Sequence, residues 1–216
     1  MTLPTLCPRA LTSPPLTVNV GHPYPVTIRS PRARLQAVIL IVAGVAGSGK
    51  TSVGALLAGR LRWRFADADT FHPEANVAKM RAGVPLTDED RAPWLRAVGD
   101  WIDARIAAGQ SGVVTCSALK RAYRDQLLSG RPAATMIFLE VSRDVLISRL
   151  NIRPGHFFPE ELLDSQLADL EPPEQDERVC AMLAEGEPEQ TAAKIIALVW
   201  PDGEPNPEAP PVLGAR

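Results

Sequence analysis

The chain has 216 residues, a formal net charge of −2 and three cysteines, and its length fits one domain with tails or at most two small domains. The near-neutral charge favours neither nucleic acid nor a membrane surface as a partner. Three widely spaced cysteines without a CxxC pair favour neither a zinc site nor a disulfide framework. The longest apolar run, residues 37–46, is too short to span a bilayer, and the N-terminus lacks the apolar core of a signal peptide. We therefore expect a protein of the reducing cytoplasm.

The prolines are concentrated near the two ends of the chain, since seven of the 21 lie in residues 1–31 and five lie in residues 201–216. Proline fixes φ and removes a backbone donor, so stretches rich in it rarely form helices or sheets. We therefore expect residues 1–34 to be a disordered extension, residues 35–200 to form one folded domain, and residues 201–216 to be a disordered tail.

Within the central domain, short apolar runs alternate with helical patterns. The expected strands are residues 37–43, 65–66, 113–116, 135–139 and 179–183, and the expected helices are residues 50–61, 94–109, 142–150 and 192–199. The first run is continuously apolar, as a strand buried on both faces should be. Strands that alternate with helices predict an α/β domain in which helices cover both faces of a parallel sheet.

The strongest motif follows the first expected strand. It fits the phosphate-binding pattern G-x-x-x-x-G-K-[ST] in full, and the residues we assign to the nucleotide are Gly44, Val45, Ala46, Gly47, Ser48, Gly49, Lys50, Thr51 and Ser52. Its glycines let several backbone N–H groups point at one phosphate, and the helix that follows adds its positive N-terminal end. Lys50 is expected to contact the β- and γ-phosphates, and the Thr51 hydroxyl is expected to ligate Mg²⁺. The motif therefore predicts a binding site for ATP or GTP.

Two carboxylates, Asp67 and Asp69, come directly after the short second strand. Residues i and i+2 of an extended segment point to the same side, and open α/β sheets bind ligands at the carboxyl ends of their strands. One carboxylate can hold Mg²⁺ through water while the other faces a substrate hydroxyl. The alternative for this pair alone is a polar turn after a strand.

Four motifs, taken together, resemble the gluconokinase family (ATP:gluconate 6-phosphotransferases). They are residues 44–51, of the form GVxGSGK[ST]; residues 67–95, with DxD, HP, KM and DR.PWL; residues 116–125, with CSALK and YR; and residues 149–158, with two arginines and GHFF. The motifs occur in order and at matching spacing from about residue 39 to residue 173. The Pro-rich ends and residues 178–187 depart from the family pattern.

The resemblance implies a fold and a set of roles. The fold is the P-loop three-layer sandwich of nucleoside monophosphate and shikimate kinases, with a five-stranded parallel sheet and a mobile lid over residues 149–159. The implied reaction is transfer of the γ-phosphate of ATP to the 6-hydroxyl of D-gluconate. Lys50, Asp69 and Arg153 are the implied catalytic residues, Arg149 and Arg153 also contact the nucleotide, and Asp67 joins Thr51 at Mg²⁺.

The pocket for gluconate needs cations for its carboxylate and hydrogen-bond partners for its hydroxyls. Besides Asp69, the candidates in the family motifs are His72, Lys79, Arg91, Lys120, Arg124 and His156. For each cation, a structural ion pair is the competing interpretation. Trp94 is expected to anchor a helix to the core, and Cys116 is expected to be a small buried residue rather than a nucleophile. The resemblance also suggests a homodimer.

Two other functions compete with this interpretation. Another small-metabolite kinase on the same scaffold, such as a shikimate kinase, would need a GGG-type substrate loop, and no such loop follows Asp69. A nucleotide-dependent regulatory module without transferase activity would lack the second carboxylate and the paired arginines of the lid. Both features are present here.

Overall fold

A computed structural model describes residues 16–18, 26–28, 37–151 and 160–200, with the backbone alone described for residues 16–18, 26–28 and 160–162. The strands are β1 (Leu16–Val18), β2 (Val26–Ile28), β3 (Ile39–Ala43), β4 (Arg64–Asp67), β5 (Gly112–Cys116), β6 (Ala134–Glu140) and β7 (Val179–Leu183). The helices are α1 (Lys50–Leu61), α2 (Glu74–Arg81), α3 (Asp88–Ala107), α4 (Arg121–Leu128), α5 (Arg143–Asn151), α6 (Glu160–Asp169) and α7 (Pro188–Val199), together with the 3₁₀ helix η1 (Ala68–Phe71).

Strands β3 to β7 form one five-stranded sheet in the order β4-β5-β3-β6-β7. All of its neighbouring strands are parallel, and β3 is central, with Ile39 paired to Gly112 on one side and to Ala134 on the other. All five residues of β3 are buried, because helices cover both faces of the sheet. This arrangement confirms the expected α/β fold and its five parallel strands.

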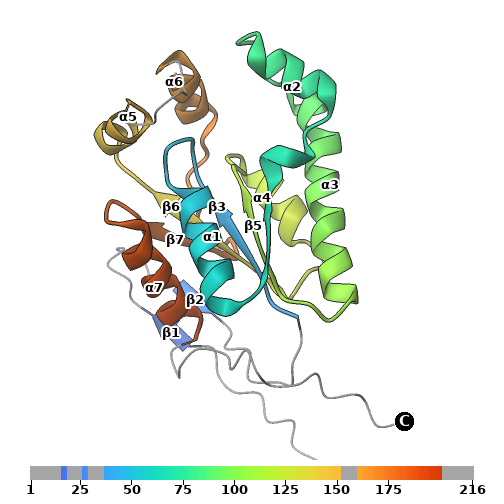
Figure 1. Cartoon of the computed structure of the whole chain (residues 1–216), viewed down its shortest axis with the longest axis vertical. Helices are drawn as coiled ribbons and strands as arrows, with labels where there is room; N and C mark the ends of the chain where they lie inside the picture. The colour runs from blue at the N-terminus through green and yellow to red at the C-terminus, as the bar shows by residue number, and fades with distance from the viewer. Residues whose placement is uncertain (1–15, 19–25, 29–36, 152–159, 201–216) are drawn as a thin grey trace, which may run out of the picture.

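The alternation of β3 side chains divides the core into two layers. Leu40 and Val42 point into a cluster with α1 and α7, whereas Ile39 and Ile41 point into a cluster with α3 and α4. Figure 1 shows these two pairs of helices on opposite faces of the sheet. A strand buried on both faces has no polar side to alternate with, so its sequence reads as one apolar run.

The carboxyl ends of the parallel strands lie along the upper edge of the sheet in Figure 1. The loop from β3 to α1 and the segment from β4 to η1 both leave from this edge. Helices α5 and α6 rise above it on one side and α2 on the other. A third apolar cluster joins this upper layer to the sheet, since Val45 packs with Leu119, Leu146 and Leu163.

The segment before residue 35 differs from our expectation in one respect. Strands β1 and β2 pair antiparallel, with Leu16 opposite Ile28, inside the stretch that we expected to lack regular structure. Their sequences, LTV and VTI, are proline-free and rich in β-branched residues, which favours strand pairing between the flanking prolines. The rest of residues 1–34, and all of 201–216, lie outside the described residues.

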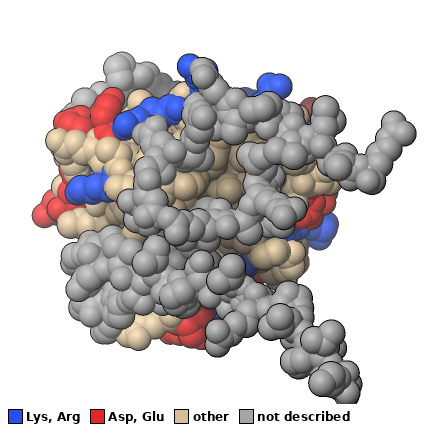
Figure 2. Space-filling model, turned by 90° about the horizontal axis from the view of Figure 1, so that it is seen from below, with Lys and Arg blue, Asp and Glu red and all other residues tan. Residues whose placement is uncertain are grey.

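Charges are mixed on the surface of the protein. Seen from below, acidic and basic side chains of the described residues are interspersed (Figure 2), as expected from a net charge of −2. In the part of the chain that the structure describes, no helix is both long and apolar enough to cross a membrane.

Candidate active site

The loop of residues 44–49 joins the buried strand β3 to helix α1 and has the backbone that its glycines permit. Gly44 and Gly49 have φ values of +141° and +92°, which side-chain-bearing residues rarely adopt. A Cβ at Gly44 would also lie 2.9 Å from the carbonyl oxygen of Leu139. Gly49 is the N-cap of α1, so the positive end of that helix faces the loop. Such features are typical of sites that bind phosphate groups.

Lys50 begins α1 and folds back over this loop. Its Nζ donates a hydrogen bond of 2.9 Å to the carbonyl oxygen of Val45, which brings the ammonium group across the concave side of the loop. A cation held there is placed to neutralise charge on a bound polyphosphate. The geometry agrees with the role predicted for Lys50.

Thr51 and Asp67 meet at the same edge of the sheet although they come from different segments. The Thr51 hydroxyl donates a hydrogen bond of 2.9 Å to Oδ2 of Asp67, and Oδ1 of Asp67 accepts the backbone N–H of Asp69 at 3.1 Å. A hydroxyl and a carboxylate are hard oxygen donors of the kind that Mg²⁺ prefers. Among the described residues, no group of three or more His, Cys, Asp or Glu side chains could hold a metal ion. The donor set therefore fits an ion that keeps several waters and binds substrate phosphates.

Asp69 is exposed in η1 next to these groups. The N-cap of η1 is Asp67, whose side chain accepts from the Asp69 N–H, so this contact ties the Asp67 carboxylate to the backbone of Asp69. Trp94 of α3 is 2% exposed and donates its indole N–H to the carbonyl oxygen of Ala68 at 2.7 Å. The indole therefore ties helix α3 to the turn of η1, which confirms the structural role expected of Trp94.

His72 lies just beyond this turn and stacks on Trp94, with ring centroids 4.5 Å apart and planes 9° apart. Its Nδ1 is 3.4 Å from the side-chain nitrogen of Asn76, which also donates to the carbonyl oxygen of Asp90 at 2.7 Å. Burial lowers the pKa of His72 below its usual value of 6.5, against the opposing effect of Asp69. The imidazole of His72 is therefore held in its neutral form close to the carboxylate of Asp69.

Arg91 and Lys120 converge on one carboxylate oxygen, although they come from different segments. Lys120 Nζ lies 2.8 Å and Arg91 Nη1 3.7 Å from Oδ1 of Asp88. The Tyr123 hydroxyl hydrogen-bonds to the same oxygen and accepts from Arg91 at 3.3 Å. Arg91 also pairs with Asp169 of α6 at 3.2 Å. The structure thus brings together Arg91 and Lys120, two of the side chains predicted to bind the substrate. The Asp88 carboxylate between them is more than half exposed.

Lys79 is placed differently. Its Nζ contacts both carboxylate oxygens of Asp90 at 2.7 Å, and Asp90 forms a capping box with Thr87 at the start of α3. The ion pair thus ties α2 to the N-terminus of α3. This contact favours the structural role over the predicted substrate contact for Lys79.

The prediction that Arg124 binds substrate is wrong. Its side chain is 0% exposed and forms an ion pair with Glu177, which is 1% exposed, at 2.6 Å. The guanidinium also donates to the carbonyl oxygens of Leu119 and Glu171. A buried charge needs such a partner, so Arg124 is committed to the protein interior and presents no surface to a ligand.

Arg149 of α5, which is predicted to contact the nucleotide, lies against the phosphate loop. Its Nη1 is 3.4 Å from the carbonyl oxygen of Ser48, and its Nη2 donates to the carbonyl oxygens of Ala184 and Gly186 at 2.9 and 3.1 Å. The side chain therefore bridges the phosphate loop and the segment after β7. Two other predicted residues, Arg153 and His156, lie outside the described residues.

One residue of the site has no role in the sequence analysis. The side-chain oxygen of Gln166, on α6, accepts a hydrogen bond of 2.7 Å from the backbone N–H of Ala46. The contact ties α6 to the phosphate loop across 120 positions of sequence. The residue pair Ser165-Gln166 stands just after the GHFF motif, but a single glutamine in sequence carries no chemical signal of its own.

Comparisons with known proteins agree with this geometry. The family model described as shikimate kinase matches residues 46–197. The gluconokinase of Gluconobacter oxydans (strain 621H) is 47% identical over 157 residues, which cover 73% of this chain and 88% of that protein.

Two solved structures are similar over most of the chain. A sugar kinase from Janibacter sp. HTCC2649 is 46% identical with a TM-score of 0.70, covering 77% of this chain and 95% of its own. A gluconokinase from Sinorhizobium meliloti 1021 is 38% identical with a TM-score of 0.66, covering 80% of this chain and 100% of its own. The chain therefore belongs to the gluconokinase family, within the wider shikimate kinase family of ATP-using P-loop kinases.

Proposed function

We propose that this protein is a gluconokinase, which transfers the γ-phosphate of ATP to the 6-hydroxyl of D-gluconate and releases 6-phospho-D-gluconate and ADP. The observation that carries the choice of acceptor is the likeness to gluconokinases over most of their length. The placement of the phosphate loop, Asp67 and Asp69 at one edge of the sheet supports the reaction type.

The residues of the chain divide the reaction between them. The phosphate loop and Lys50 hold the polyphosphate, and Arg149 approaches from α5. Thr51 and Asp67 would hold Mg²⁺, which supplies positive charge between the phosphate groups when bound. Asp69 orients the 6-hydroxyl and accepts its proton as the new phosphate ester forms. Because the transition state of phosphoryl transfer is loose, the hydroxyl has to be oriented as well as deprotonated.

We assign the acceptor's carboxylate to Arg91 and Lys120. Both cations and the Tyr123 hydroxyl contact one carboxylate oxygen of Asp88, and an incoming carboxylate would take the place of that oxygen between them. Such charge-assisted contacts are among the stronger hydrogen bonds in proteins. His72, which stacks on Trp94 close to Asp69, is assigned to a hydroxyl of the sugar acid.

Two residue roles in the proposal rest on the resemblance alone. Arg153 is assigned to the transferring phosphate and His156 to the lid over the acceptor, and both residues lie outside the described part of the chain. The homodimer and the cytoplasmic location also stay predictions.

The test is a coupled assay of the purified full chain. ATP, Mg²⁺ and D-gluconate are supplied, and 6-phosphogluconate is detected by an NADP-linked dehydrogenase, with Lys50→Ala as the control. Shikimate, glycerate and nucleosides are assayed in parallel by ADP release. Saturable turnover on gluconate that disappears in Lys50→Ala is the expected result. Turnover on another acceptor would discard gluconate while keeping the kinase, and tight ATP binding with no acceptor would favour a regulatory module.

A further inference from the structure

Arg124 of α4 is the most completely enclosed charge of the described chain, and the reaction as proposed makes no use of it. Its Nε and Nη2 donate to the two carboxylate oxygens of Glu177 at 2.6 and 2.8 Å. This two-point contact fixes the plane of the guanidinium, because both groups are flat and rigid. The remaining nitrogen, Nη1, then points in one direction only.

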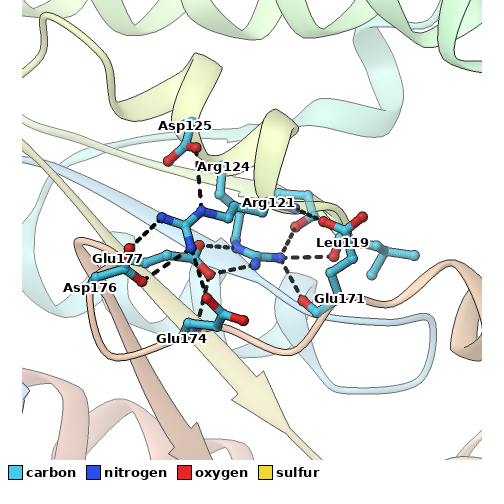
Figure 3. Close-up of polar contacts among 9 residues, drawn as sticks. Leu119, Arg121, Arg124, Asp125, Glu171, Glu174, Asp176 and Glu177 are labelled. Carbon is cyan, nitrogen blue, oxygen red and sulfur yellow. Dashed lines mark hydrogen bonds and ion pairs between the residues drawn. The ribbon is translucent and has the colours of Figure 1, made fainter.

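That nitrogen binds the backbone of two separate segments. Nη1 donates to the carbonyl oxygens of Leu119 at 2.8 Å, Glu171 at 2.9 Å and Ala118 at 3.4 Å (Figure 3). Ala118 and Leu119 belong to the loop between β5 and α4, which we call the acceptor loop (residues 117–120). Glu171 belongs to the stretch from α6 to β7, which we call the exit segment (residues 170–178). The guanidinium therefore joins the two.

Both segments lead to the active site. The acceptor loop ends in Lys120, one of the two cations assigned to the substrate carboxylate, and starts at Ser117, whose carbonyl oxygen accepts from the N–H of Gly44 at 3.3 Å. The exit segment follows α6, which carries Gln166 and Asp169. A rigid contact between the two segments would thus keep Lys120 at a fixed distance from the phosphate loop and from α6.

The backbone of the acceptor loop needs such a contact. Ala118 has a φ of +42°, a left-handed conformation that is uncommon for a residue with a side chain and persists where the surroundings hold it. Its carbonyl and the next one both face the Arg124 guanidinium. Without these donors the Leu119 carbonyl would keep only the N–H of Glu171 at 3.1 Å, and the loop, with Lys120 at its end, would be free to shift.

We propose that Arg124 is a positioning residue for phosphoryl transfer, which sets the acceptor loop, and through it Lys120, at the correct distance from the phosphate loop. The proposal rests on the proposed kinase function but is independent of which sugar acid is the acceptor. Displacements of about 1 Å in a substrate-positioning group can cost about a hundredfold in rate. The expected signature is therefore a change in acceptor use rather than in ATP binding.

The main variant is Arg124→Met with Glu177→Met, which removes both charges and keeps an apolar filling of similar length. Exchange of a buried ion pair for apolar residues commonly preserves stability, so this variant separates positioning from folding. We expect a melting temperature near that of the wild type, a KM for the acceptor raised about tenfold or more, and an unchanged Kd for ATP measured by titration calorimetry. Wild-type KM and kcat for the acceptor would overturn the proposal.

Arg121 supplies a matched control on the same helix. Its side chain is partly exposed and pairs with Glu174 at 2.9 Å and Asp176 at 2.6 Å (Figure 3). It thus grips the exit segment from outside through side chains, while its guanidinium makes none of the contacts to the acceptor-loop carbonyls that Arg124 makes. Arg121→Met should leave the KM for the acceptor within about twofold, since surface ion pairs contribute little. A rise as large as in the double variant would show that any loosening of the exit segment suffices.

Two single variants decide the question if the double variant fails to fold. Glu177→Gln leaves Arg124 in place with its carbonyl contacts, whereas Arg124→Lys keeps the charge but replaces the planar fork by a single ammonium. We expect Arg124→Lys to raise the KM for the acceptor and Glu177→Gln to lower the melting temperature without that rise. The opposite ranking would overturn the proposal. If gluconate is not the acceptor, the same comparison is made with the acceptor found by ADP release, so failure of the proposed function remains distinguishable.

Discussion

The Thr51 hydroxyl, in the first turn of α1, donates a hydrogen bond of 2.9 Å to Asp67 at the end of β4. Strand β5 separates β4 from β3, the strand that leads into the phosphate loop. The contact therefore spans two steps of the sheet and brings the two proposed magnesium ligands together.

Asp67→Asn should weaken the use of Mg²⁺ more than the binding of nucleotide. The amide oxygen can still accept from the Asp69 N–H while the amide nitrogen donates to the Thr51 hydroxyl oxygen, so local structure is kept, but the negative charge that attracts a divalent ion through water is lost. We expect the Mg²⁺ concentration for half-maximal rate to rise about tenfold, a difference of about 1.4 kcal/mol. Titration of Mg²⁺ at fixed ATP measures it, and an unchanged Mg²⁺ requirement would remove Asp67 from the metal site.

Asp69→Asn should lower kcat with little effect on ATP affinity. The amide can still hydrogen-bond to the 6-hydroxyl but cannot accept its proton, and general-base assistance is typically worth about 10²–10⁴-fold. Steady-state rates and the Kd of ATP are measured on the same preparation. Equal losses in both would instead assign Asp69 to the nucleotide.

Gln166→Leu should weaken the phosphate loop from a distance. The substitution keeps a side chain of similar size but leaves the partly buried Ala46 N–H without its acceptor, which costs a fraction of the penalty of about 1–3 kcal/mol for a fully buried unpaired donor. We expect the KM for ATP to rise about fivefold or more, because the loop loses its tie to α6. Ala168→Gln, on the exposed face of the same helix, is the control. An unchanged KM for ATP in Gln166→Leu would show that the tie is dispensable.

The sequence predicted best the segment in which the same residues determine both the backbone conformation and the binding chemistry. Strand β3, its glycine-rich loop and helix α1 follow from one apolar run and one motif, and α1 was predicted with its observed bounds, Lys50–Leu61. Strand β7 also agrees, at Val179–Leu183. The ends of the other strands moved by one or two residues, as expected where apolar runs fade into loops.

Helices α2, α4 and α6 were not predicted as elements, and α2 and α4 show two different physical reasons. The buried residue of α2 is Asn76, so the helix has no apolar stripe to detect. In α4 the buried face holds Tyr123, Arg124, Leu127 and Leu128, and an arginine interrupts the apolar pattern. The polar contacts of both helices, and the core packing of α4, are made with distant segments, which a local pattern cannot show.

The same limit explains the one site assignment that failed. Arg124 and Lys120 stand four positions apart in one family motif, and both read as cations for a sugar acid. Their difference is set by Glu177, 53 residues further along the chain, which encloses Arg124 and leaves Lys120 at the site. Charge type and spacing predicted that cations would gather here, and the tertiary contact decided which of them is accessible.

Cys116 and Cys180 should be unreactive in the native protein. Burial raises the pKa of the Cys116 thiol to about 12 and that of Cys180 to about 11, and the thiolate is the reactive form. A Cys7→Ser variant should show about zero reactive thiols at pH 8 with a disulfide reagent when native, and both remaining ones in urea. Rapid labelling of the native variant would contradict the burial of these thiols and reopen a chemical role for Cys116.

His72 should make the unliganded protein less stable in mild acid. Burial lowers the pKa of His72 below 6.5, so the unfolded chain binds this proton more readily than the folded one. Stability therefore rises with pH through this window, and it is lost as pH falls from the unfolded pKa of about 6.5 toward the folded pKa.

His72→Phe keeps a flat ring to stack on Trp94 and removes the titration. We expect the melting temperature, measured between pH 7.5 and 5.5 without ligand, to fall less in His72→Phe than in the wild type. The other two histidines are present in both proteins and cancel in this comparison, so an equal fall would show that His72 is not buried in its neutral form.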